Sequence, residues 1–181
     1  MTLWLVRHAQ PLVASGICYG ATDIAADACA TQKAAQRLAD AVPSGAIVLS
    51  SPLQRCEQLT QVLRGLRPNL AYKTDARLRE MDFGQWEGQA WESIPHVELD
   101  AWTSHFATWP CGGAECVDDF MARVGAAWDE ARVRDQPVVW ITHAGVARAA
   151  TLLHQGRRQV DDARQWPTQA PAYGEWRVLD I

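Results

Sequence analysis

The stretch Thr2-Leu-Trp-Leu-Val-Arg-His8 joins a short strand-forming run to two basic side chains at its end. Two later stretches repeat the pattern: Ala46-Ile-Val-Leu49 before Ser50-Ser-Pro-Leu-Gln-Arg55, and Val138-Val-Trp-Ile141 before Thr142-His143. The carboxyl ends of parallel strands meet at one edge of an α/β sheet, where ligands bind. If the three strands are parallel neighbours, four basic side chains converge on one crevice. They are Arg7, His8, Arg55 and His143.

A cluster of fixed cations and hydrogen-bond donors is typical of a phosphate site. A histidine among cations stays neutral, because neighbouring positive charges disfavour its protonated form, and a neutral imidazole can attack phosphorus. We therefore expect His8 to be the nucleophile, with Arg7 and Arg55 binding the phosphoryl oxygens. His143 would share the charge that develops on those oxygens, and the helix expected after Gly145 would add its N-terminus to the anion site.

Length and composition limit the possible functions. The 181 residues fit one domain, 1–181, and 48% hydrophobic with 21% charged residues is ordinary for a globular chain. A net charge of -4 gives no general attraction to nucleic acid or to an anionic membrane. No apolar run approaches the roughly 20 residues of a membrane span. We expect a small phosphorylated metabolite as partner, no nucleic acid or membrane, and a monomer or homodimer.

The cysteines and the first residues bear on location. Five cysteines, odd in number and scattered, argue against a disulfide framework and for a reducing cytoplasm. Cys111 and Cys116 do not have the spacing of a zinc site, so we expect no metal there. The start lacks a basic region before its apolar run and is therefore expected to form a strand rather than a signal peptide.

Alternating strand and helix signals predict α/β layers around a largely parallel sheet. Ser51 and Pro52 suit the N-cap and first turn of the second helix. The segment 89–111 is rich in aromatic residues at loose helical spacing, which indicates a small helical cap beside the sheet. The expected strands are 2–6, 46–49, 70–73, 138–141 and 173–179, and the expected main helices are 26–41, 52–66, 115–132 and 146–154.

Hydrolysis of a phosphate ester also needs an acid for the leaving oxygen. The segment Leu78-Arg-Glu-Met-Asp-Phe-Gly-Gln-Trp-Glu-Gly88 supplies Glu80 as the best candidate. Shielding by Phe83 and Trp86 would keep its proton near neutral pH. The same group could then activate the water that cleaves a phosphohistidine. Three other carboxylates compete for the role: Glu57, Asp82 and Glu87.

Four motifs together resemble the histidine phosphatase superfamily, the phosphoglycerate mutase-like proteins. They are Leu5-Val-Arg-His-Ala-Gln10, Ser50-Ser-Pro-Leu-Gln-Arg55, Leu78-Arg-Glu-Met-Asp-Phe-Gly84 with Trp86-Glu-Gly88, and Thr142-His-Ala-Gly145. The resemblance implies a three-layer α/β/α sandwich with a largely parallel central sheet. It also implies phosphoryl transfer through a phosphohistidine, with neither metal nor cofactor. By matching motif positions, it gives His8 as nucleophile, Glu80 as proton donor, and a phosphate pocket of Arg7, Arg55 and His143.

Three further residues are candidates for substrate binding. Gln10 and Ala144 lie inside the motifs, and Thr22 lies in the loop that follows the first strand. Thr22 could equally set the turn of that loop. The family's Gly-Gly-Glu-Ser segment here reads Gly112-Gly-Ala-Glu-Cys116, with one extra residue and a cysteine, so the role of Glu115 stays open.

The loop Ser15-Gly-Ile-Cys-Tyr-Gly-Ala-Thr-Asp-Ile24 is similar to the α-ribazole phosphatase branch of the superfamily. This similarity implies hydrolysis of α-ribazole 5′-phosphate in cobalamin biosynthesis. One alternative is a broad sugar-phosphate phosphatase or a phosphoglycerate mutase-like enzyme. An alternative of another class is a noncatalytic protein that binds a phosphorylated ligand.

The nine tryptophans allow two interpretations. Four of them fall in or near the expected cap: Trp86, Trp91, Trp102 and Trp109. They could pack the cap on the sheet, as large aromatic side chains usually do. One or two of them could instead stack on an aromatic base of the substrate, which alanine variants of Trp102 and Trp109 would test.

Overall fold

The computed structural model describes residues 1–181 and has a five-stranded sheet in the order β3-β2-β4-β1-β5. The strands are β1 (Thr2–Arg7), β2 (Ile47–Ser50), β3 (Ala71–Thr74), β4 (Val138–Thr142) and β5 (Trp176–Asp180). Every neighbouring pair is parallel except β1 and β5, which are antiparallel. The predicted α/β class with a largely parallel sheet is therefore confirmed.

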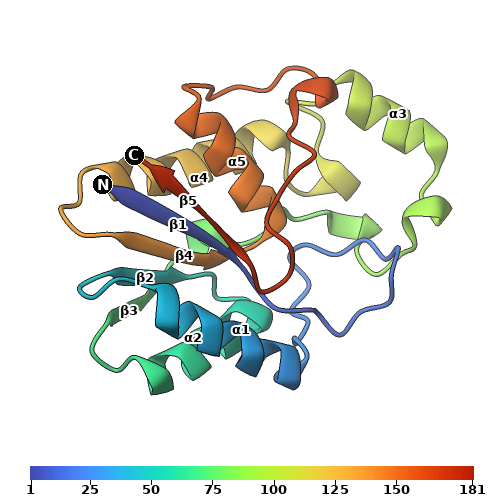
Figure 1. Ribbon diagram of the computed structural model, residues 1–181. Helices are drawn as coiled ribbons and strands as arrows, with labels where there is room; N and C mark the ends of the chain where they lie inside the picture. The colour runs from blue at the N-terminus through green and yellow to red at the C-terminus, as the bar shows by residue number, and fades with distance from the viewer.

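Helices cover both faces of this sheet. Figure 1 shows α1 and α2 on one face, α4 and α5 on the other, and α3 set apart from the sheet. The helices are α1 (Ala28–Ala41), α2 (Gln54–Leu66), α3 (His96–Ser104), α4 (Val117–Arg132) and α5 (Ala144–His154). The arrangement is the expected three-layer α/β/α sandwich, and α3 lies within the segment 89–111 where a cap was expected.

The alternation of side chains along the central strands explains the two helical layers. In β1, Leu5 belongs to the core shared with α4 and α5, whereas Val6 belongs to the core shared with α1 and α2. In β4, Trp140 and Ile141 divide between the two cores in the same way. A parallel strand buried on both faces must be apolar at nearly every position, and all five residues of β4 are buried.

The register of the strands brings their carboxyl ends together. Arg7 of β1 pairs with Thr142 of β4, and Ser50 of β2 pairs with Ile141 of β4. The residues that follow the three strands therefore sit at one edge of the sheet. This confirms that the three strands are parallel neighbours.

The start of α2 differs from the prediction. The helix begins at Gln54, its N-cap position is occupied by Leu53, and Ser51 is not the cap. The Gln54 amide instead donates to Asp23 Oδ1 at 2.6 Å, so the loop after β1 caps this helix. The Ser51 hydroxyl accepts from the Leu53 amide at 3.3 Å, just before the helix, and lies 2.9 Å from His143 Nε2.

The last strand also begins later than predicted, at Trp176 instead of Tyr173. Gly174 adopts a φ of 71°, a left-handed conformation that glycine tolerates, and it turns the chain before β5. Its amide donates to the carbonyls of Arg7 (3.2 Å) and His8 (3.0 Å). The turn therefore places Tyr173 beside the end of β1 and outside the sheet. None of the helices is both long enough and apolar enough to cross a membrane.

Candidate active site

His8 directly follows β1 and is only 2% exposed. Its Nδ1 lies 2.7 Å from the carbonyl oxygen of Ala9. A carbonyl only accepts hydrogen bonds, so Nδ1 carries the proton and Nε2 keeps its lone pair. Burial, followed by the positive charge of Arg55, lowers the pKa of His8 to about 3. Burial therefore contributes more to the neutral state than the cations on which the sequence argument relied.

Arg55 lies in the first turn of α2 and is fully buried. It donates from Nη2 to Gly20 O at 2.6 Å, from Nη1 to Thr22 O at 2.8 Å, and from Nε to His143 Nδ1 at 3.3 Å. Three of the five N–H groups of the guanidinium are thus used to fix it in place. The other two remain for a phosphoryl group.

Arg7 precedes His8 at the end of β1, and its guanidinium is held by an aromatic residue. Its guanidinium carbon is 3.8 Å from the ring centroid of Tyr173, and its Nη1 donates to Pro171 O at 3.2 Å. The buried Nε of Arg7 has no hydrogen-bond partner within the protein. The geometry fits the predicted phosphate clamp.

Two tyrosines beside His8 were not predicted from the sequence. The Tyr173 ring centroid is 5.6 Å from that of His8, and the Tyr173 hydroxyl lies 2.9 Å from the Tyr19 hydroxyl. Tyr19 in turn lies under Arg55, with 5.3 Å between the guanidinium carbon and the ring centroid. The Tyr173-Gly174 pair, a possible turn signal, was the only local hint of this position.

His143 is fully buried, and its ring centroid is 5.1 Å from that of His8. Because Nδ1 accepts from Arg55, Nε2 carries the proton and donates to Ser51 Oγ at 2.9 Å. Burial, followed by the charge of Arg55, holds its pKa well below the usual value. His143 therefore orients Arg55 as a neutral ring, and its direct contact with the phosphoryl group stays a prediction.

Glu80 lies against the N-terminus of α5. Its Oε2 accepts from the Gly145 amide at 3.0 Å, and its Oε1 accepts from the Met81 amide at 3.1 Å. A Cβ atom at position 145 would come within 2.2 Å of Glu80 Oε1, so glycine is required for this approach. The helix starts at Ala144, two residues earlier than predicted, with His143 as its N-cap residue. The hydrogen bond therefore holds the Glu80 carboxylate at Gly145, two positions along the chain from His143.

The competing carboxylates are occupied elsewhere. Burial raises the pKa of Glu87, but hydrogen bonds from the Thr22 side chain and from backbone amides outweigh burial, so its pKa lies below the usual value. Asp82 accepts from the Gly84 amide at 2.9 Å. Glu57 lies in a separate hollow with Lys73. Only Glu80 reaches the start of α5.

An ion pair between Arg123 and Glu115 holds the backbone around Glu80 and gives Glu115 a structural role. Arg123 Nε lies 2.6 Å from Glu115 Oε1, and Arg123 also donates to the carbonyls of Arg77 (2.7 Å), Arg79 (2.7 Å) and Glu80 (3.0 Å). Glu115 Oε2 accepts from the backbone amide of Asp82 at 3.0 Å. The pair thus ties α4 to the residues on both sides of Glu80.

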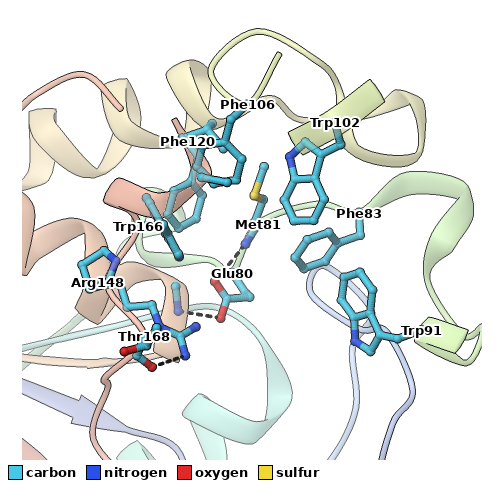
Figure 2. A pocket seen from close by; sticks show the side chains of 14 residues that line it. Glu80, Met81, Phe83, Trp91, Trp102, Phe106, Phe120, Arg148, Trp166 and Thr168 are labelled. Atoms are coloured by element: carbon cyan, nitrogen blue, oxygen red, sulfur yellow. Dashed lines mark hydrogen bonds between the residues drawn. The ribbon is translucent and has the colours of Figure 1, made fainter. Parts of the chain in front are cut away.

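A cavity of about 500 Å³ extends from Glu80 toward α3, as Figure 2 shows. Its polar edge holds Glu80 and Arg148, and its walls are mainly aromatic: Phe83, Trp91, Trp102, Phe106, Phe120 and Trp166. Trp86, expected to shield Glu80, does not line it. The Trp86 indole is buried and donates to Glu98 Oε2 at 2.6 Å, so of the two aromatic residues expected to shield Glu80, Phe83 lines the cavity and Trp86 does not.

The remaining predicted substrate residues have different placements. The Thr22 hydroxyl bonds to Glu87, which favours a role in setting the loop, while its carbonyl holds Arg55. Gln10 is exposed and lines a separate hollow together with Tyr19 and Tyr173. Ala144 is the first residue of α5 and is buried. No group of three or more His, Cys, Asp or Glu side chains is arranged to hold a metal ion.

Comparison with known proteins adds relatives of stated activity. The chain is 34% identical over 127 residues to glucosyl-3-phosphoglycerate phosphatase of Mycobacterium tuberculosis (strain ATCC 25618 / H37Rv). That match covers 59% of this chain and 54% of the relative, so it spans about half of the relative's length.

Solved structures resemble the chain over nearly its whole length. The protein TTHB049 of Thermus thermophilus shares 29% identity and a TM-score of 0.74, over 99% of this chain and 94% of that one. An Escherichia coli protein provisionally assigned as an alpha-ribazole-5'-P phosphatase shares the fold, with a TM-score of 0.81 at 22% identity and coverage of 98% and 89%. The pattern of the histidine phosphatase superfamily (branch 1) matches residues 3–179, and the chain therefore belongs to that superfamily.

Proposed function

We propose that this protein is a phosphomonoester hydrolase that works through a phosphohistidine at His8. One observation carries the proposal: the buried His8 ring donates from Nδ1 to Ala9 O, which leaves Nε2 unprotonated beside two arginines. A neutral nitrogen held next to unpaired guanidinium donors is the arrangement that attack on a phosphoryl group requires. The buried Nε of Arg7 and two N–H groups of Arg55 are those donors.

In the first step, His8 Nε2 attacks phosphorus, and the bond from phosphorus to the ester oxygen breaks. The protonated carboxyl of Glu80 gives its proton to that oxygen, so the alcohol leaves neutral. Arg7 and Arg55 bind the phosphoryl oxygens and stabilise the negative charge that develops on those oxygens in the transition state. His8 Nδ1 keeps its proton and donates it in the hydrogen bond to Ala9 O, so the N-phosphorylated ring carries a positive charge.

In the second step, water attacks the phosphorus of phosphohistidine, and the bond to Nε2 breaks. The Glu80 carboxylate takes a proton from that water, which restores both its own protonated form and neutral His8. The Gly145 amide and the Met81 amide keep the carboxylate in place during both steps. Inorganic phosphate is the product.

The first-choice substrate is α-ribazole 5′-phosphate, an intermediate of cobalamin biosynthesis. The similarity of the loop 15–24 to the α-ribazole phosphatase branch supports this choice, and the Gly20 carbonyl of that loop accepts a hydrogen bond from Arg55. The mycobacterial relative supports the alternative of a sugar-phosphate substrate. We place the reaction in the cytoplasm, because all five cysteines are free thiols and a small phosphorylated metabolite is the expected partner.

The decisive test is rapid mixing of the wild type and His8→Ala with a phosphomonoester in chelator, followed by intact-mass spectrometry. A transient phosphate adduct on the wild type alone, with turnover unaffected by chelator, is the expected result. Turnover by His8→Ala at the wild-type rate, or activity lost to chelator, would overturn the mechanism.

Two other functions predict different results. A mutase would interconvert 2- and 3-phosphoglycerate in the presence of the bisphosphate, so that conversion would replace the hydrolase proposal. A noncatalytic binder would retain phosphorylated ligands without turning over any member of a wide panel. The chain has both a candidate nucleophile, His8, and a candidate acid, Glu80, which supports the enzyme over the binder.

A further inference from the structure

We propose that the cavity beyond Glu80 binds the leaving group, and that it selects a flat, apolar ring system carrying hydrogen-bond acceptors. Arg148 is the residue that we assign to specificity, with Trp102 as a second donor. The inference rests on the proposed function, because it concerns the alcohol that Glu80 protonates. It adds Arg148 to the site, and it gives Trp102 the role of a hydrogen-bond donor in the cavity.

The position of Glu80 connects the cavity to the reaction. The acid that protonates the ester oxygen must lie next to the leaving group, and Glu80 lies at one end of the cavity together with Gly145. Gly145 is two residues from His143 at the sheet edge. A substrate whose phosphoryl group sits at His8 therefore directs its alcohol portion past Glu80 into this space.

The walls form a continuous aromatic arc. Ring centroids are 5.4 Å apart for Phe83 and Trp91, 6.4 Å for Phe83 and Trp102, and 5.5 Å for Trp102 and Phe106. Phe106 continues the arc to Trp166 at 6.1 Å, which brings α3 and the segment before β5 together. A volume of about 500 Å³ with nine hydrophobic residues among fourteen suits an aromatic ring system.

The polar groups of the cavity are mostly donors. Arg148 Nη2 donates to Thr168 O at 3.1 Å, but its buried Nε has no partner, and no carboxylate forms an ion pair with it. The buried Trp102 Nε1 also has no partner, and Figure 2 shows it on the side of the ring that faces Met81. Sugar hydroxyls need acceptors as well as donors, whereas a ring nitrogen needs only a donor.

The inference predicts a preference that can be measured on a matched pair of substrates. Benzimidazole ribonucleoside 5′-phosphate and ribose 5-phosphate share the same primary alcohol as leaving group, so their intrinsic reactivities are alike. We expect kcat/KM to be at least about tenfold higher for the benzimidazole compound, since stacking of a base is worth about that much. Equal values, or a preference for glucosyl-3-phosphoglycerate, would overturn the proposal and leave the hydrolase intact.

Variants separate the cavity from the general fold. Arg148→Met and Trp102→Phe should each lower kcat/KM for the benzimidazole compound by about tenfold and change it less than about twofold for ribose 5-phosphate. Trp109→Leu is the control, because Trp109 is 39% exposed and lies outside the cavity. Equal losses on both substrates would show a structural role and would contradict the assignment.

A binding measurement tests the cavity even if turnover fails. Benzimidazole ribonucleoside, which has no phosphate, should quench tryptophan fluorescence of the wild type and of His8→Ala, and Arg148→Met should weaken this binding about tenfold. Binding without turnover would reject the hydrolase and keep the cavity assignment. Turnover of ribose 5-phosphate without any binding of the nucleoside would do the reverse.

Discussion

The phosphate pocket and the aromatic cavity adjoin at Glu80, yet they are built in different ways. The pocket uses residues that directly follow strands or begin a helix: Arg7 and His8 at the end of β1, Arg55 in α2 and His143 after β4. The cavity draws its lining from separate parts of the chain: the segment 80–83, the turn at Trp91, α3 with Phe106 just after it, α4, α5 and the segment 163–168. The order and direction of the strands therefore bring the residues of the phosphate pocket together, whereas the packing of loops and helices assembles the walls of the cavity.

The two regions also differ in their chemistry. In the phosphate pocket, His8, Arg55 and His143 are buried, and each is held by hydrogen bonds to a backbone carbonyl or a neighbouring side chain. In the cavity, apolar rings dominate and only Glu80 and Arg148 are charged. Such a division is expected when one region stabilises a reaction common to all phosphomonoesters and the other distinguishes among them.

The largest effect should come from the phosphate pocket. His8→Ala should lower kcat by at least about 10⁴-fold for every substrate, because the nucleophile is lost and both ring nitrogens of the neighbouring His143 are hydrogen-bonded. Single-turnover rates for both members of the matched pair would measure this loss. A loss confined to one substrate would contradict the assignment of His8 to the common step. Unchanged thermal unfolding of the variant is the control.

Glu80→Gln acts where the two regions meet. We expect kcat to fall by about 10²- to 10³-fold for alkyl esters, which need a proton on the leaving oxygen. The loss should be much smaller for p-nitrophenyl phosphate, whose phenolate leaves without a proton. Comparison of kcat for the two ester types measures the difference. Equal losses would assign Glu80 to positioning and not to proton transfer.

Arg123 tests how far the acid depends on its supporting residues. Arg123→Met removes hydrogen bonds to three carbonyls and the pair with Glu115, so kcat should fall about tenfold with a smaller change in KM. The free energy of unfolding should fall by about 1–3 kcal/mol, because two partly buried carbonyls lose their donor and Glu115 loses its ion-pair partner. Arg158→Met is the matched control, since Arg158 pairs with Asp129 at the surface. Similar losses in both variants would rule out a specific role for Arg123.

The smallest expected effect is the contribution of His8 to the pH dependence of stability. Burial lowers its pKa to about 3, so between pH 6.5 and about 3 the unfolded chain binds a proton that the folded chain does not. The contribution of His8 to the free energy of unfolding is therefore fully present above about pH 6.5, and it falls by about 1.4 kcal/mol per pH unit below that pH. Urea unfolding of the wild type and His8→Asn at pH 7, 6 and 5 measures this slope. An unchanged slope in the variant would contradict the assignment.

Strand positions and motif order predicted the layers, the parallel sheet and the clustering of the basic residues. These features depend on apolar runs, such as the fully buried β4, whose periodicity is visible in one dimension. The N-cap of α2 was predicted wrongly, because Asp23, which is 31 residues earlier, takes that role. Tyr173 was assigned to a strand, although the turn at Gly174 places it against His8.

By itself, the sequence determined which side chains follow the ends of the strands, because parallel strands bring their carboxyl ends to one edge whatever the loops do. Only the tertiary structure decided which carboxylate meets α5, which tryptophans line the cavity and that Arg148 lies beside Glu80. These contacts join residues far apart in the chain. Their formation depends on how loops and α3 pack, and no local periodicity encodes that packing.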